Sequence, residues 1–369
     1  MREKINVKTG GKLYIAGEYS VLTPGQSAII KNIDIFMNAE ISFLGESEDR
    51  NDEKIEDADK NKEKSDFKKY EIFSDMFDYS VSLEYDKNYS LIQETVVVVN
   101  EYLENKGIDT QPFKLRITGK MEKDGKKYGI GSSGSVTVLV VKAMFELYSR
   151  KLALEAEFKG QRSELLAKDT MFKLSSYVLL KRGDNGSMGD IACIAYENLV
   201  AYKSFDREKI QKEIREKTLE EVLELDWGYE IEELRCSGNY EFLVGWTKKP
   251  SISKDMINLV KSSINQDFLK KVEKIVQNLK LAMKNGNKME IKRNILENGN
   301  ELKKLKEEIY SEELVELVEA TENLDVCAKS SGSGGGDCGV AISFSKKDSE
   351  ILVERWKSVG IELLYKSEF

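Results

Sequence analysis

Short apolar runs broken by glycine and proline characterise the first third of the chain. The runs over residues 7–22 and 33–44 have the composition of strands, and residues 70–74 and 113–118 add two shorter candidates. Between these two, Ser90–Asn105 has the length of a helix and ends just before a glycine, which commonly terminates helices. This part of the chain therefore predicts a mixture of short strands and helices.

Longer patterns of apolar and polar positions follow this part of the chain. Residues 132–150 and 168–181 predict helices, and the apolar positions of the second recur close to every 3.6 residues. The C-terminal half predicts further elements in this order: a strand at 242–246, lysine- and glutamate-rich helices within 255–323, a strand at 340–344, a helix at 347–358 and a strand at 362–365. The predicted class is α+β.

The length of 369 residues is more than one domain usually holds, so two are expected, 1–216 and 217–369. The boundary lies within a shift of composition over residues 205–230. No apolar run approaches the roughly 18 residues that cross a bilayer, and the N-terminus lacks the apolar core of a signal peptide. We therefore expect a cytoplasmic protein without a membrane partner.

The absence of histidine restricts the possible chemistry. Histidine-based triads and zinc sites of the Cys/His type are excluded, and no two of the four cysteines form a C-x-x-C pair. In a reducing cytosol the cysteines are expected to be small buried hydrophobic residues. Any proton transfer must then use Asp, Glu, Lys, Tyr or water.

The net charge of −8 argues against a nucleic-acid surface. Part of this charge is local, because residues 46–66 carry ten acidic and five basic side chains but only two apolar ones, Ile55 and Ala58. Such a segment cannot bury enough apolar surface to offset the entropy lost on ordering. It predicts a mobile acidic insertion on the surface.

The densest chemical signal is the glycine–serine run 129–136, which a predicted helix follows directly. Glycines let the backbone approach a ligand closely, a helix N-terminus favours negative charge, and serine hydroxyls can reach phosphate or Mg²⁺. The residues that form this candidate ATP site are Gly129, Gly131, Ser132, Ser133, Gly134 and Ser135.

Three familiar glycine motifs resemble this run, but none of them accounts for the chain. The dinucleotide fingerprint needs an acidic residue at the end of the next strand, but Glu146, near that distance, lies within a predicted helix. The P-loop pattern fails because Ser135 stands where lysine is required. The protein-kinase glycine loop matches, yet the chain has neither H-R-D nor D-F-G. A dinucleotide-dependent oxidoreductase therefore stays only as a weakened alternative.

Two other segments complete a pattern: KLYIAGEYSVL from Lys12 onward, and AKSSGSGGGDCG, which includes Lys329. With SLIQETV, YGIGSSGSV and LLKRGDNGSMGD, they resemble the galactokinase–homoserine kinase–mevalonate kinase–phosphomevalonate kinase superfamily over essentially the whole chain, and the bacterial phosphomevalonate kinases most strongly. The resemblance implies a two-domain fold with a ferredoxin-like C-terminal domain and an active site in the cleft between the domains.

The resemblance also implies roles for individual residues. Lys12 and Asp190 match the catalytic lysine and aspartate of the family, and Ser133 matches the serine that ligates Mg²⁺. Glu94 is a candidate second ligand because it lies in SLIQETV, and Gly336 is expected to support the site together with its two neighbouring glycines. The expected substrate-binding residues are Lys12, Tyr19, Lys181, Arg182, Ser187, Gly334 and Gly335.

By this resemblance, the expected reaction is phosphorylation of 5-phosphomevalonate to 5-diphosphomevalonate by ATP and Mg²⁺, a step of isoprenoid biosynthesis. A phosphate acceptor is already mostly a dianion at neutral pH, so Asp190 is left as either a base or a residue that orients Lys12 or the acceptor. It is expected in the first turn of a helix capped by Ser187. Mevalonate kinase or another kinase of the superfamily remains an alternative, as does an inactive nucleotide-binding scaffold.

Overall fold

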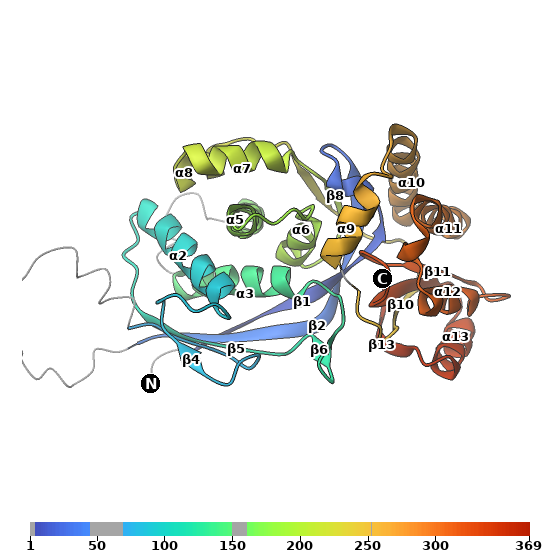
Figure 1. The fold of residues 1–369 in the computed structure, drawn as a ribbon, viewed down its shortest axis with the longest axis horizontal. Coiled ribbons are helices and arrows are strands. Elements are labelled where there is room, and N and C mark those ends of the chain that lie inside the picture. The colour runs from blue at the N-terminus through green and yellow to red at the C-terminus, as the bar shows by residue number, and fades with distance from the viewer. Residues whose placement is uncertain (1–3, 45–68, 150–160, 252) are drawn as a thin grey trace, which may run out of the picture.

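The computed structural model describes residues 4–44, 69–149, 161–251 and 253–369. Two sheets lie side by side along the long axis of the molecule, each covered by helices (Figure 1). The acidic insertion predicted at 46–66 lies outside the described residues. Among the described residues, no helix combines the length and the apolar composition that a membrane span requires.

The first sheet has seven strands in the order β4-β3-β5-β2-β8-β9, and β1 also pairs with β2. β5 alternates buried and exposed residues, as expected for a strand with one face on a core. Apart from β3 and β5, which are parallel, the paired strands run antiparallel. The strands are β1 (Ile5–Ala16), β2 (Ser27–Phe43), β3 (Glu71–Ser74), β4 (Ser80–Val81), β5 (Phe113–Thr118), β8 (Leu199–Lys203) and β9 (Glu230–Glu233).

Helices cover one face of this sheet, and β6 and β7 form a separate two-stranded hairpin beside it (Figure 1). α3 contacts β1, β2, α2, α5 and α6, which explains why its sequence is apolar on nearly all sides. The elements are η1 (Ser20–Leu22), α2 (Ser90–Asn105), β6 (Glu122–Lys123), β7 (Lys126–Lys127), α3 (Ser132–Leu147), α5 (Gln161–Lys181), α6 (Gly189–Tyr196), α7 (Arg207–Glu216) and α8 (Leu219–Glu224).

The second sheet has four antiparallel strands in the order β11-β12-β10-β13. With helices between β10 and β11 and between β12 and β13, this is a ferredoxin-like arrangement, so the predicted two-domain α+β fold is confirmed. The elements are β10 (Glu241–Trp246), α9 (Ser253–Lys261), α10 (Gln266–Lys284), α11 (Lys288–Leu305), η3 (Glu307–Ile309), α12 (Glu312–Glu319), β11 (Val326–Ser330), β12 (Cys338–Ser343), α13 (Lys346–Ser358) and β13 (Glu362–Glu368).

Two predicted boundaries need correction. The strand predicted over 7–22 ends at Ala16, because the next residue, Gly17, has φ +94° and a side chain there would meet the Ser27 carbonyl oxygen at 2.4 Å. The chain leaves the first sheet only after β9, so the predicted domain boundary at 216/217 is too early. The change in composition that suggested it belongs to α7 and α8, which still pack on the helices of the first sheet.

Candidate active site

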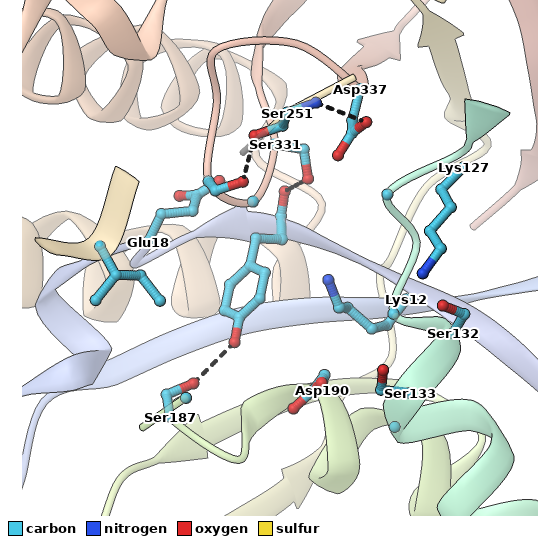
Figure 2. Close-up of a pocket in the computed structure, with 18 of the residues that line it drawn as sticks. Lys12, Glu18, Lys127, Ser132, Ser133, Ser187, Asp190, Ser251, Ser331 and Asp337 are labelled. Atoms are coloured by element: carbon cyan, nitrogen blue, oxygen red, sulfur yellow. Dashed lines mark hydrogen bonds between the residues drawn. The ribbon is translucent and has the colours of Figure 1, made fainter. Parts of the chain in front are cut away.

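A cavity of about 590 Å³ lies where the two halves of the chain meet, namely the half that forms the first sheet and the half that forms the second. Its walls come from β1, the N-termini of α3 and α6, the β6–β7 hairpin and the glycine-rich loop after β11 (Figure 2). Except for the β6–β7 hairpin, which directly precedes α3, these segments carry motifs that the sequence analysis selected. The cavity therefore brings residues from several of these motifs together.

The glycine–serine loop enters this cavity as the N-terminal end of α3. Gly129 and Gly131 have φ +77° and +86°, which favour glycine. The backbone N–H of Lys12 donates to the Ile130 carbonyl at 2.9 Å and fixes the loop to β1. Ser132 and the exposed Ser133 then line the cavity in the first turn of a sixteen-residue helix. Such a helix terminus can bind an anion.

Ser135 lies on the other side of the same helix turn. It is fully buried, and its hydroxyl lies 2.8 Å from Thr9 Oγ1, which also contacts the Ser135 carbonyl oxygen at 3.0 Å. Ser135 is therefore not among the cavity residues, in contrast to the sequence prediction. Because Thr9 lies on β1, these contacts anchor the first turn of α3 to that strand.

Lys12 extends from β1 into the middle of the cavity (Figure 2). Glycine at position 131 makes room for it, because a Cβ there would lie 2.8 Å from Lys12 Cε. The ammonium nitrogen is 5.4 Å from the centroid of the Tyr14 ring. Among the described residues it has no ion-pair partner within 4.0 Å, so its charge is available to an anionic ligand.

Asp190 faces Lys12 from the first turn of α6 (Figure 2). It packs tightly against α3, where a Cβ on Gly134 would lie 3.0 Å from Asp190 Oδ2. Burial raises the pKa of the Asp190 carboxyl, and the nearby charge of Lys12 partly offsets this effect. The pair places one carboxylate and one ammonium group opposite the glycine–serine loop.

Ser187 lines the cavity, but it does not cap α6 as predicted. The N-cap is Met188, with φ +63°, and Ser187 Oγ accepts a hydrogen bond from Gly189 N at 3.2 Å. Ser187 Oγ also lies 3.0 Å from the Tyr14 hydroxyl, and the Tyr202 hydroxyl donates to the Ser187 carbonyl at 2.7 Å. This network holds the wall below Tyr14 in a fixed geometry.

The glycine-rich loop closes the cavity from the second half of the chain. The Tyr19 hydroxyl donates to the Ser333 carbonyl, and Ser331 Oγ donates to the Tyr14 carbonyl at 2.9 Å. Gly334 and Gly335 do not line the cavity; both have positive φ, and a Cβ on Gly334 would meet the Ile309 carbonyl oxygen at 2.4 Å. They shape the turn behind the cavity wall.

Asp337, at the end of this loop, joins three segments. Its Oδ1 accepts a hydrogen bond from Ser251 N at 3.1 Å, and its backbone nitrogen donates to the Lys249 carbonyl at 2.7 Å. A Cβ on Gly129 would lie 2.3 Å from Asp337 Oδ2, so this contact also requires glycine at position 129. Burial raises the pKa of Asp337, while the Ser251 hydrogen bond and the charge of Lys12 oppose the rise.

Comparisons with known proteins link this chain to the GHMP kinases. Residues 90–198 match the model of the GHMP kinases N-terminal domain, and residues 279–362 match that of the GHMP kinases C-terminal domain. A Streptomyces phosphomevalonate kinase is 25% identical, with 95% of this chain and 93% of that protein aligned. The phosphomevalonate kinase of Streptococcus pneumoniae, solved in complex with phosphomevalonate and AMPPNP, is 44% identical, with 99% of this chain and 100% of that chain covered and a TM-score of 0.86.

The chain belongs to the phosphomevalonate kinase family. Mevalonate kinases are more distant: that of Methanococcus jannaschii is 19% identical, with a TM-score of 0.67 and coverage of 100% of this chain and 99% of that chain, which shows a shared fold alone. The kinase assignment removes the dinucleotide-dependent oxidoreductase that the glycine pattern had left open.

For this member of the phosphomevalonate kinase family, the structure does not bring every predicted residue into the cavity. Arg182, at the end of α5, donates to Glu94 Oε2 at 2.8 Å and to Ser90 Oγ at 3.1 Å. Lys181 is exposed, and none of Lys181, Arg182 and Glu94 is among the described residues that line the cavity. Gly336 likewise lies outside the lining and packs on the Lys249 carbonyl oxygen.

Other cavity residues of this phosphomevalonate kinase family member escaped the sequence analysis. Lys126 and Lys127 lie on the β6–β7 hairpin, and Lys127 extends toward Ser132 (Figure 2). Neither lysine has an ion-pair partner among the described residues. The sequence does carry a signal for this hairpin, because Asp-Gly is a common hairpin turn. Asp124 and Gly125 have φ +53° and +74°. It introduces two lysines directly before the glycine–serine loop.

Proposed function

We propose that this chain transfers the γ-phosphoryl group of ATP to 5-phosphomevalonate and so forms 5-diphosphomevalonate. The observation that carries the proposal is the cation Lys12, which lies between the α3 N-terminus and Asp190 without an ion-pair partner among the described residues. A site that must hold two anionic substrates needs such unpaired positive charge. The S. pneumoniae relative, solved in complex with phosphomevalonate and AMPPNP, supports this choice of substrates.

In the proposed arrangement the ATP phosphates lie on the loop Gly129–Ser133, with its backbone N–H groups and the α3 N-terminus as donors. The bond between the γ-phosphorus and the β,γ-bridging oxygen breaks, and an oxygen of the acceptor phosphate forms the new P–O bond. Little covalent chemistry is left for the protein, so positioning and charge neutralisation dominate. Lys12 and Lys127 would stabilise the charge on the transferred group.

Magnesium is part of the proposal, and the cavity fits it. Mg²⁺ prefers oxygen ligands and commonly uses one or two protein groups together with substrate phosphates. Ser133 and Asp190 offer a hydroxyl and a carboxylate on the same cavity wall. Within the described residues no cluster of three or more Asp, Glu, His or Cys residues could hold a metal ion, so a shared site is the one that fits. When bound, Mg²⁺ supplies positive charge to the ATP phosphates.

Removal of the Ser133 hydroxyl tests this assignment. For Ser133→Ala we expect the Mg²⁺ concentration at half-maximal rate to rise about tenfold, the size of change typical when a group near a metal is lost. Steady-state rates measured over a Mg²⁺ series at saturating ATP give this value. Ser358→Ala, a change of an exposed serine on α13, is the control. An unchanged Mg²⁺ dependence in Ser133→Ala would remove Ser133 from the site.

The acceptor is tested directly by ADP release in a coupled assay with MgATP. We expect fast turnover with 5-phosphomevalonate and at least about 10²-fold slower turnover with mevalonate, galactose and homoserine, because none of these brings the phosphate that Lys12 would contact. Fast turnover with mevalonate alone would overturn the acceptor while keeping the kinase. ATP binding without turnover of any acceptor would favour the inactive scaffold.

A further inference from the structure

A buried ion pair joins the two halves of the molecule beside the cavity. Lys329, on β11, contacts the carboxylate Oε1 of Glu18, which lies in the turn after β1. The two side chains are 0% and 2% exposed, and their residues are 311 positions apart in the chain. Lys329 also donates to the Ser330 carbonyl at 2.6 Å. Of these groups, Glu18 itself lines the cavity.

Other contacts between the halves surround this pair. Gly17 N donates to Asn298 Oδ1 on α11 at 3.0 Å, and the Tyr19 hydroxyl donates to the Ser333 carbonyl. Ser331 Oγ donates to the Tyr14 carbonyl at 2.9 Å. Tyr14 and Tyr19 line the cavity on one side of the junction, and Ser331 and Ser333 line it on the other. The junction is therefore part of the cavity wall (Figure 2).

We propose that the Glu18–Lys329 pair acts as a positioning device that fixes the β1 turn against the glycine-rich loop and so sets the distance between the two walls of the cavity. Neither residue is assigned contact with the transferred phosphoryl group. The proposal rests on the proposed function, since it concerns the geometry in which that transfer takes place.

Stability alone is a weak reason for this arrangement. Two charges removed from water lose their hydration, and an apolar pair of similar volume is often as stable as a buried ion pair. Glu18 Oε2 is buried without a hydrogen-bond partner in the described part of the chain, which makes the pair less favourable still. The next residue, Tyr19, has φ +62° and ψ −44°, a strained conformation for a side chain of this size. An unfavourable buried charge pair and a strained backbone beside a site indicate a geometry that function requires.

Loss of charge and loss of positioning have different signatures. If the pair acted only through charge, Lys329→Met would leave the Glu18 carboxylate facing the anionic substrates and raise their KM. Glu18→Gln would leave the Lys329 ammonium group and lower KM. A positioning role predicts a change in the same direction for both variants, namely a lower kcat. Displacement of catalytic groups by about 1 Å can reduce the rate about 10²-fold.

The experiment compares Glu18→Gln, Lys329→Met and the double variant, each as the full chain. We expect kcat to fall about tenfold to hundredfold in all three. The thermal midpoint should fall in Lys329→Met and recover in the double variant, because the double variant leaves no unpaired buried charge. Glu232→Gln is the matched control: it breaks partly exposed ion pairs that also join the two halves, including Lys280–Glu232 at 2.5 Å, and should keep the wild-type kcat.

Recovery of both the thermal midpoint and kcat in the double variant would overturn the proposal and leave a purely structural pair. So would opposite effects of the two single variants on KM with kcat unchanged. If Lys329→Met does not fold, Glu18→Gln and the double variant carry the same comparison.

Hydrogen exchange gives a readout that does not depend on turnover. Backbone amides of residues 14–22 and 328–337 should exchange faster in the double variant than in the wild type, while those of α13 should not change. Unchanged exchange at the junction would count against positioning. Absence of wild-type turnover with 5-phosphomevalonate would instead refute the proposed function, and the exchange comparison would still test the pair.

Discussion

Replacement of Lys12 by methionine is expected to reduce kcat about 10³-fold, with a much smaller change in the KM for ATP. This expected factor in kcat follows from the rate losses measured when one preorganised group that stabilises transition-state charge is removed. Methionine fills a similar volume, so the space beside Gly131, where a Cβ would lie 2.8 Å from Lys12 Cε, stays occupied. Only the charge is removed. Steady-state kinetics with 5-phosphomevalonate and MgATP measure the effect.

The matched control is Lys8→Met, which removes a lysine from the same strand. Lys8 is exposed, and its ammonium group lies 3.7 Å from the centroid of the Phe36 ring, away from the cavity. We expect this variant to keep the wild-type rate. A loss below tenfold in Lys12→Met would contradict the central role given to this residue. Substitution by arginine should not restore the rate, because the longer planar guanidinium does not fit the space at Gly131.

The sequence identified the catalytic candidates but not the framework that holds them. Lys12, Ser133 and Asp190 lie in short motifs with their own chemical signals, and the structure brings all three to one cavity. Arg182 was selected because it lies in the same motif as Asp190, LLKRGDNGSMGD. It lies in the turn that follows α5, directly before Gly183 with φ +78°, and faces Glu94 on α2 instead. Closeness to Asp190 in the sequence did not place Arg182 in the cavity, because a turn separates the two residues.

The Glu18–Lys329 contact shows the opposite difficulty. Both residues lie in recognised motifs, yet nothing local indicates that a glutamate in a turn and a lysine in a strand are partners across 311 positions. β11 itself was not predicted, because a charged residue in a five-residue strand beside a glycine-rich loop has no apolar alternation. Every residue of β11 is buried, so only the tertiary structure explains the charged position. Long-range pairing therefore had to come from the structure.

Asp190→Asn is expected to make the protein more stable and less active. The Asn side chain can keep the hydrogen bond in which Ile191 N donates to Asp190 Oδ1 at 3.0 Å. The substitution removes a carboxylate whose pKa is raised by burial. A raised pKa means that the folded state binds the proton more tightly than the unfolded state. The wild type therefore loses stability as the pH rises from the unfolded pKa, about 4, through the folded pKa. Chemical denaturation should show a larger advantage for the variant at pH 8 than at pH 4.

The exposed carboxylate of Asp267, which pairs with Lys271 at 2.7 Å, supplies the control for this trend. Asp267→Asn should show no gain in stability as the pH rises. Equal stability of Asp190→Asn and the wild type at pH 8 would contradict the burial argument.

The activity of Asp190→Asn separates two roles. For a residue that orients Lys12 we expect kcat to fall about 10²-fold, the cost of a small misplacement. The acid limb of the pH–rate profile should remain near pH 6, because the second pKa of a phosphate monoester lies there and belongs to the acceptor. If Asp190 instead removed a proton, the variant would lose a limb that the wild type shows, and the residual rate would depend on added base. Near-normal turnover would exclude both of these roles and the proposed contribution of Asp190 to Mg²⁺ binding. Asp190 would then be a helix-terminal charge that lowers stability without benefit to the reaction.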